Sequence, residues 1–165
     1  MKRIFYVLLA FATISLTTSC ESVGPKERGV EVSYGGETNM KTIYPPGMSG
    51  GLHWMVDDMV LYDVSQSTVV EKYEFNDSRN MLTGVEISVD YSLDPGKVNL
   101  LHANINNHMI KLEKTIKAAA KEVIPQYSAS ELNLTKRGEA EAKIGSILSK
   151  ELPEFYLVFD RVQLT

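Results

Sequence analysis

The stretch Val85-Glu-Ile-Ser-Val-Asp-Tyr-Ser-Leu93 carries the clearest structural pattern in this 165-residue chain. Apolar residues alternate in it with polar or acidic ones. Because successive side chains of a strand point to opposite faces, the pattern predicts a strand with one buried and one hydrated face. Asp94-Pro95-Gly96 follows directly and predicts the end of that strand. The segments on either side decide what covers the buried face.

The residues that precede this stretch predict more strands. Alternation or short β-rich runs occur at residues 29–34, 40–44, 59–64 and 69–75. The last two runs form either two strands or one long bent strand. Gly35-Gly36 and residues 76–80 are expected to be turns.

Tyr44-Pro-Pro-Gly-Met-Ser-Gly-Gly51 is the strongest cluster of chain breakers and predicts a loop. Apolar and aromatic residues gather in and after it, namely Tyr44, Met48, Leu52, Trp54 and Met55. We interpret the segment as a loop that covers one end of the sheet, because tryptophan usually supplies core area. The alternative is a membrane-interface loop formed by Tyr44, Met48, Leu52 and Trp54, since tyrosine and tryptophan are favoured at lipid interfaces.

The residues that follow the central strand change to a helical period. Residues 98–105 and 105–124 predict helices, and the second keeps Lys111, Lys114, Lys117 and Lys121 on its face toward water. Ser128 and Glu131 predict a capping box, and Thr135 is expected to cap a third helix that ends at Pro153. Residues 155–164 predict a final strand. This order predicts an α+β fold, a mainly antiparallel sheet followed by helices and one last strand.

The first twenty residues, MKRIFYVLLAFATISLTTSC, have the features of an export signal. Lys2 and Arg3 precede an apolar run to about Leu16, which is shorter than the roughly 20 residues of a membrane span. The only cysteine, Cys20, follows small residues and resembles the lipidated cysteine of a bacterial lipobox, although Thr17 stands where leucine is usual. An ordinary signal peptide and an uncleaved anchor are the alternatives.

The lipobox interpretation predicts how the N-terminal residues are divided and where the protein is located. Residues 1–19 would be a lipoprotein signal peptide, Cys20 the lipid attachment site, and residues 20–27 a polar tether. We therefore expect a bacterial membrane location, lipid-anchored and facing the periplasm or the cell exterior. Stable anchoring takes more than one acyl chain, and a lipoprotein cysteine carries more than one.

Composition restricts the partners. Hydrophobic residues make up 44% and charged residues 23% of the chain, as in an ordinary globular protein. Without the signal, 15 basic and 21 acidic residues remain, a net charge of −6 by formal count. Nucleic acid and anionic lipid surfaces attract clustered basic residues, so neither is expected as a partner.

Residues that could carry catalysis are scattered. His53, His102 and His108 do not stand at metal-ligand spacing, and the sequence holds no nucleophile elbow or phosphate-binding loop. Asp57, Asp58 and Asp77 could share a metal or an acid–base role, but we interpret them as solvated surface. We expect no enzyme, no catalytic residue, no metal and no cofactor.

Several segments form an ordered series along the chain. The first half of the series is Gly29-Val-Glu-Val, Pro46-Gly47, Leu52-His53-Trp54, Leu61-Tyr-Asp-Val64 and Val85-Glu-Ile-Ser-Val-Asp-Tyr-Ser-Leu-Asp-Pro95. The second half is Glu122-Val-Ile, Tyr127-Ser-Ala-Ser-Glu-Leu132, Thr135-Lys-Arg137 and Phe159-Asp-Arg-Val-Gln-Leu164. This ordered series resembles the SPFH domain of the band 7 family, the prohibitins, stomatins and flotillins, with the prohibitin branch nearest. The resemblance covers residues 28–165.

This resemblance implies a non-catalytic, membrane-tethered scaffold or adaptor that organises membrane proteins or regulates a membrane protease. Its partners would be the membrane, through the lipid, and other proteins. Family members usually continue into a coiled coil, whereas this sequence ends at Thr165. We therefore expect a small homo-oligomer, a complex with a longer SPFH protein, or a monomeric adaptor. The alternative function is a periplasmic or surface lipoprotein that binds a soluble ligand or protein partner.

Overall fold

The computed structural model describes residues 21–49 and 57–165. The chain divides into two compact units, one that ends at Tyr62 and one that begins at Asp63. We call them the first and the second unit and describe each by itself.

The first unit is built from short paired strands. Strand β1 (Glu21–Val23) pairs antiparallel with β3 (Gly47–Ser49), and β2 (Glu27–Ser33) pairs with β4 (Asp57–Asp63). Val23 and Val30 are its buried apolar side chains among the described residues. Two isolated bridges, Gly29 with Tyr44 and Val32 with Thr38, hold the connecting segment against β2.

Three sequence-based expectations for the first unit were wrong. The expected tether contains β1 and the start of β2, because Gly24 and Pro25 allow a turn in which the Glu27 amide donates to the Gly24 carbonyl at 3.0 Å. The expected loop contains β3, whose residues find their partners in that supposed tether. The expected strand at residues 40–44 makes a single bridge through Tyr44.

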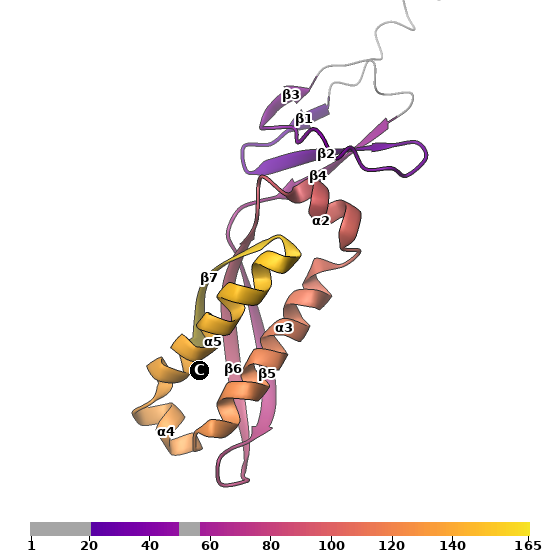
Figure 1. The fold of residues 1–165 in the computed structure, drawn as a ribbon. Coiled ribbons are helices and arrows are strands. Elements are labelled where there is room, and N and C mark those ends of the chain that lie inside the picture. The colour runs from indigo at the N-terminus through magenta and orange to yellow at the C-terminus, as the bar shows by residue number, and fades with distance from the viewer. Residues whose placement is uncertain (1–20, 50–56) are drawn as a thin grey trace, which may run out of the picture. The chain divides into compact units, whose positions relative to one another are not determined.

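The second unit contains one antiparallel sheet with the strand order β5-β6-β7, as Figure 1 shows. Its strands are β5 (Ser67–Asn76), β6 (Leu82–Leu93) and β7 (Leu157–Leu164). Its helices are α2 (Val98–Asn104), α3 (His108–Val123), α4 (Ala129–Leu134) and α5 (Arg137–Glu151). Helices α3 and α5 lie side by side along one face of this sheet (Figure 1).

The core of the second unit lies between the sheet and these two helices. The predicted alternation in β6 is confirmed, with its odd-numbered residues buried from Val85 to Leu93. Fully buried residues of α3 and α5 complete the core, among them Leu112, Ile116, Ile144 and Leu148. The expected α+β architecture is therefore confirmed.

The capping residues set the helix boundaries. The predicted capping box at Ser128 and Glu131 is present and begins α4. Helix α3 begins at His108 rather than Ile105, because the side chain of Asn107 accepts a hydrogen bond from the Ile110 amide and Ile105 is extended. Thr135 ends α4, and Lys136 is the residue that precedes α5. The expectation that Thr135 caps the third helix was wrong.

Candidate functional site

Two of the sequence-predicted site residues, Tyr44 and Met48, are described in the first unit. Cys20, Leu52 and Trp54 are outside the described residues. Met48 lies in β3, where its backbone pairs with Ser22. Tyr44 lies opposite Gly29 of β2, with backbone hydrogen bonds in both directions at 2.9 and 3.0 Å. Both described residues are therefore fixed by pairing with earlier strands.

A polar cluster around Glu31 holds the side chain of Tyr44. The Tyr44 hydroxyl donates to Glu31 Oε2 at 3.0 Å, and the Asn39 side-chain amide donates to the same oxygen at 2.8 Å. The ring of Tyr44 is half-buried. This arrangement orients Tyr44 toward β2 and explains why the segment follows that strand.

His53 is outside the described residues, and the other histidines and aspartates considered in the sequence do not form a metal site in the part that the structure describes. No group of three or more histidine, cysteine, aspartate or glutamate residues suited to a metal occurs in the described part of the chain. His102 lies in α2, and His108 is the first residue of α3, where burial lowers its pKa.

Asp77 differs from its expected role as solvated surface. It is only 4% exposed and serves as a backbone anchor. Its Oδ1 accepts hydrogen bonds from the amides of Arg79 and Met81 at 2.8 and 2.9 Å, and its Oδ2 accepts one from Ala129 at 3.2 Å. These bonds, that from Met81 first, lower the pKa of Asp77. Asp77 thus joins the β5–β6 turn to the first residue of α4.

A polar network crosses the outer face of the sheet, by which we mean the face opposite α3 and α5. Asp90 of β6 accepts a hydrogen bond from the Thr68 hydroxyl of β5 at 2.7 Å. Its other oxygen accepts from Arg161 of β7 through Nε at 3.3 Å and Nη2 at 3.0 Å. The hydrogen bonds from Thr68 and then Arg161 lower the pKa of Asp90. Sequence reasoning placed Asp90 on the hydrated face, but Asp90 is only 9% exposed because Thr68 and Arg161 cover it. Arg161 was missed, since its pairing with Asp90 depends on strand register.

The two edges of this sheet differ. On β7, the Leu164 amide points away from β6 and donates to Glu141 of α5 at 2.9 Å. On β5, the hydrogen bond of 2.8 Å from the Asp77 amide to the Met81 carbonyl sets the ladder register. Hydrogen-bonded pairs then alternate along the hairpin, so odd-numbered residues of β5 bond to β6. The even-numbered residues Thr68, Val70, Lys72 and Glu74 direct their backbone groups outward.

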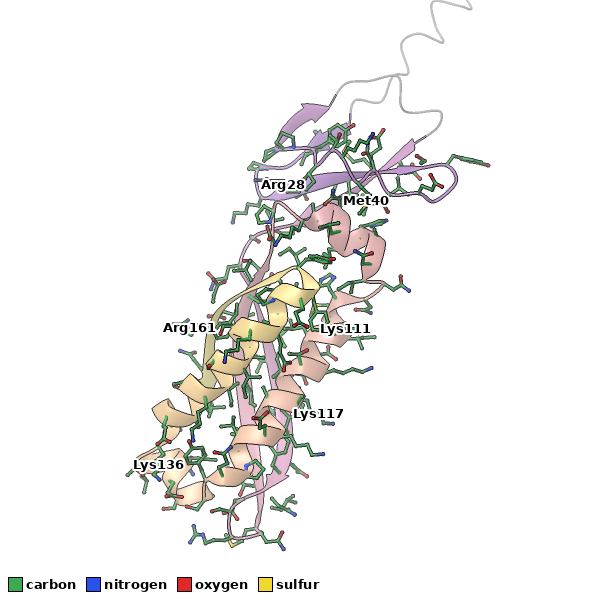
Figure 2. All side chains as sticks on the ribbon, viewed as in Figure 1. Arg28, Met40, Lys111, Lys117, Lys136 and Arg161 are labelled. Atoms are coloured by element: carbon green, nitrogen blue, oxygen red, sulfur yellow. The ribbon has the colours of Figure 1, made fainter. Side chains whose placement is uncertain are left out.

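An open groove of about 630 Å³ spans β5 and the adjacent part of β6. It is lined by β5 residues 72–75 together with Gly84, Val85, Glu86, Lys117 and Thr165. Figure 2 shows Lys117 on α3, and its ammonium lies 5.9 Å from the centre of the Tyr73 ring. Burial, followed by the nearby carboxylates of Glu71 and Glu113, raises the pKa of Tyr73 to about 12. The groove therefore contains side chains of both charges, from Lys72, Glu74, Glu86 and Lys117.

Comparisons with known proteins identify the fold at family level. No helix in the part that the structure describes is long and apolar enough to cross a membrane. A comparison with curated proteins gave no match. The family model described as SPFH domain / Band 7 family matches residues 21–165, which is the whole chain after Cys20. The chain therefore belongs to the SPFH, or Band 7, family.

Proposed function

We propose that this protein is a membrane-tethered scaffold or adaptor, held by lipid on Cys20, that organises membrane proteins or regulates a membrane protease. The match to the SPFH family, a family of membrane-associated scaffolds, carries this proposal. The matched region begins at Glu21, and strand β1 begins at the same residue. A lipid on Cys20 would therefore hold the first unit next to the bilayer without an intervening linker.

The electrostatics support anchoring by lipid. The chain after the signal carries a net charge of −6 by formal count, so an anionic bilayer does not attract it. Two or more acyl chains supply the attraction instead, at about 0.8 kcal/mol for each buried CH₂ group.

Membrane fractionation of a bacterium that expresses the full chain tests the anchor. The wild-type chain should remain with the membranes after a high-salt wash, whereas Cys20→Ala should leave them. Cys20→Ser keeps the size and polarity of the side chain but removes the thiol, so it should leave the membranes as well. Retention of both variants in the washed membranes would overturn lipid anchoring.

We further propose that the segment after Tyr44 covers the domain and does not enter lipid. The contacts of Tyr44 with Gly29 and Glu31 and the pairing of β3 with β1 support this choice. Trp54 is the only tryptophan, so its fluorescence reports on this segment alone. Reconstitution into vesicles with brominated lipids should leave the emission unquenched. Strong quenching would favour a membrane-interface loop.

A further inference from the structure

We propose that the β5 edge binds β5 of a second copy of this chain, antiparallel, with Lys72 opposite Glu74 of the second copy. The sheet then continues across a two-fold axis. This inference rests on the proposed scaffold function, since it names the partner through which the scaffold would assemble.

The β5 edge has the hydrogen-bonding capacity to pair with another strand. The outward backbone groups of Thr68, Val70, Lys72 and Glu74 have no strand partner among the described residues. An exposed row of such groups is a template for another strand. The opposite edge is different, because the Leu164 amide is already bonded to Glu141. The asymmetry makes β5 the edge available for pairing.

Charges on β5 are complementary in one register of the pair. Lys72 and Glu74 are exposed neighbours on the outer face, and the Lys72 side chain is 81% exposed. In a two-fold antiparallel pair centred on Tyr73, each Lys72 lies opposite Glu74 of the second copy. Oppositely charged residues at such positions stabilise paired strands, and like charges destabilise them. The symmetry makes this ion pair twice.

The face of the sheet that the helices cover favours the same register. In the same register Tyr73 lies opposite Tyr73 of the second copy, and aromatic cross-strand pairs are favourable. The Tyr73 hydroxyl donates to the Glu113 carbonyl at 3.4 Å, and its ring lies near Lys117. Because the axis passes through Tyr73, Glu113 of one copy falls on the side of Lys117 of the other. The helix face therefore repeats the complementarity of the outer face.

The same residues disfavour other registers. A lysine on an edge strand usually disfavours non-specific pairing with a strand of another chain. A pair centred on Lys72 would place that lysine against Lys72 of the second copy. A pair centred on Glu71 would place Lys72 against the apolar Val70. A pair shifted the other way, centred on Glu74, would place two like-charged Glu74 side chains against each other. Lys72 thus contributes both to the proposed contact and to its specificity.

Light scattering of the full chain in mild detergent measures the assembled mass and tests whether the outward backbone groups of β5 are needed for assembly. The wild type should contain at least two copies. Val70→Pro should lower the mass, because proline removes an outward N–H while the bonds from β5 to β6 remain. Val70→Thr is the matched control and should keep the wild-type mass. A single-copy wild type, or a Val70→Pro variant with unchanged mass, would overturn the proposal.

Charge reversal tests the register. Lys72→Glu and Glu74→Lys should each weaken the dimer about tenfold, because like charges then face each other twice. The double variant restores opposite charges and should dimerise again. Glu86→Gln is the control, since it removes only the intramolecular ion pair of 3.0 Å with Lys72. Loss of the dimer in the double variant would contradict this register.

The two proposals fail in different assays. Failure of lipid anchoring appears in the washed membranes and leaves the mass in detergent unchanged. Failure of strand pairing appears in the mass and leaves the fractionation unchanged. Circular dichroism of each variant confirms that a lower mass comes from a folded chain.

Discussion

The second unit, from Asp63 onward, buries far more apolar surface than the first unit. Its sheet and helices enclose fully buried side chains such as Ile87, Ile116 and Leu148. The first unit buries Val23 and Val30 among its described residues and relies on short strand pairs and the Glu31 cluster. Regions with few buried apolar contacts open more easily. The difference in burial indicates a stable second unit and a first unit that opens more easily.

The largest expected effect is loss of core packing in the second unit. Leu148 of α5 is fully buried, so Leu148→Ala should lower the free energy of unfolding by about 2–5 kcal/mol. Leu134→Ala, at a residue 79% exposed, should change it by less than about 0.5 kcal/mol. Urea unfolding followed by circular dichroism measures both. Equal effects would show that the second unit does not depend on this core.

A smaller, local effect is expected in the first unit. Val30 of β2 is fully buried, and Val30→Ala removes two methyl groups, a loss of roughly 1–3 kcal/mol. Hydrogen exchange should become faster in β2 and β4 and stay unchanged in β6. If exchange in β6 accelerated by the same factor, the two units would open together, which would contradict a first unit that opens independently of the second.

The contribution of Asp77 to the stability of the fold should depend on pH. Its folded pKa is lowered, so its contribution to stability is present above the unfolded pKa of about 3.9 and is lost as pH falls through the folded value. Asp77→Asn should therefore lower the thermal midpoint at pH 7, and the difference from wild type should shrink below about pH 4. Thermal scans from pH 7 to pH 3 measure it. A constant difference would exclude the ionised carboxylate as the cause.

The smallest expected effect lies on the outer face. Arg161 is largely exposed, so Arg161→Ala should change the thermal midpoint at pH 7 less than Val30→Ala does. It should also raise the pKa of Asp90 toward its ordinary value, so that acid unfolding begins at a higher pH. NMR titration of the Asp90 carboxyl checks this shift. An unchanged pKa would leave Thr68 as the main partner.

Sequence patterns predicted the second unit better than the first. Alternation in β6 and the helical period of α3 and α5 report directly on burial, because each long element has one continuous apolar face. The capping box at Ser128 and Glu131 is local, so it was also predictable. The start of α3 was missed because apolar Ile105 fits the helical spacing but is extended in the structure.

Short non-local pairs were not predictable from the sequence. Strands β1 and β3 have three residues each, too few for a period, and lie far apart along the chain. The buried state of Asp77 depends on the amide of Ala129, 52 residues later. The hydrogen bonds between Arg161 and Asp90 likewise join residues 71 positions apart. Such contacts follow from register and topology, which no local pattern encodes.

Native mass spectrometry of the protein released from membranes tests the central claim of a lipid-tethered, assembling scaffold most directly. The account predicts a mature chain that begins at Cys20, carries acyl chains, and is present in a complex with at least one more copy. A chain without lipid that is present only as a single copy would contradict it.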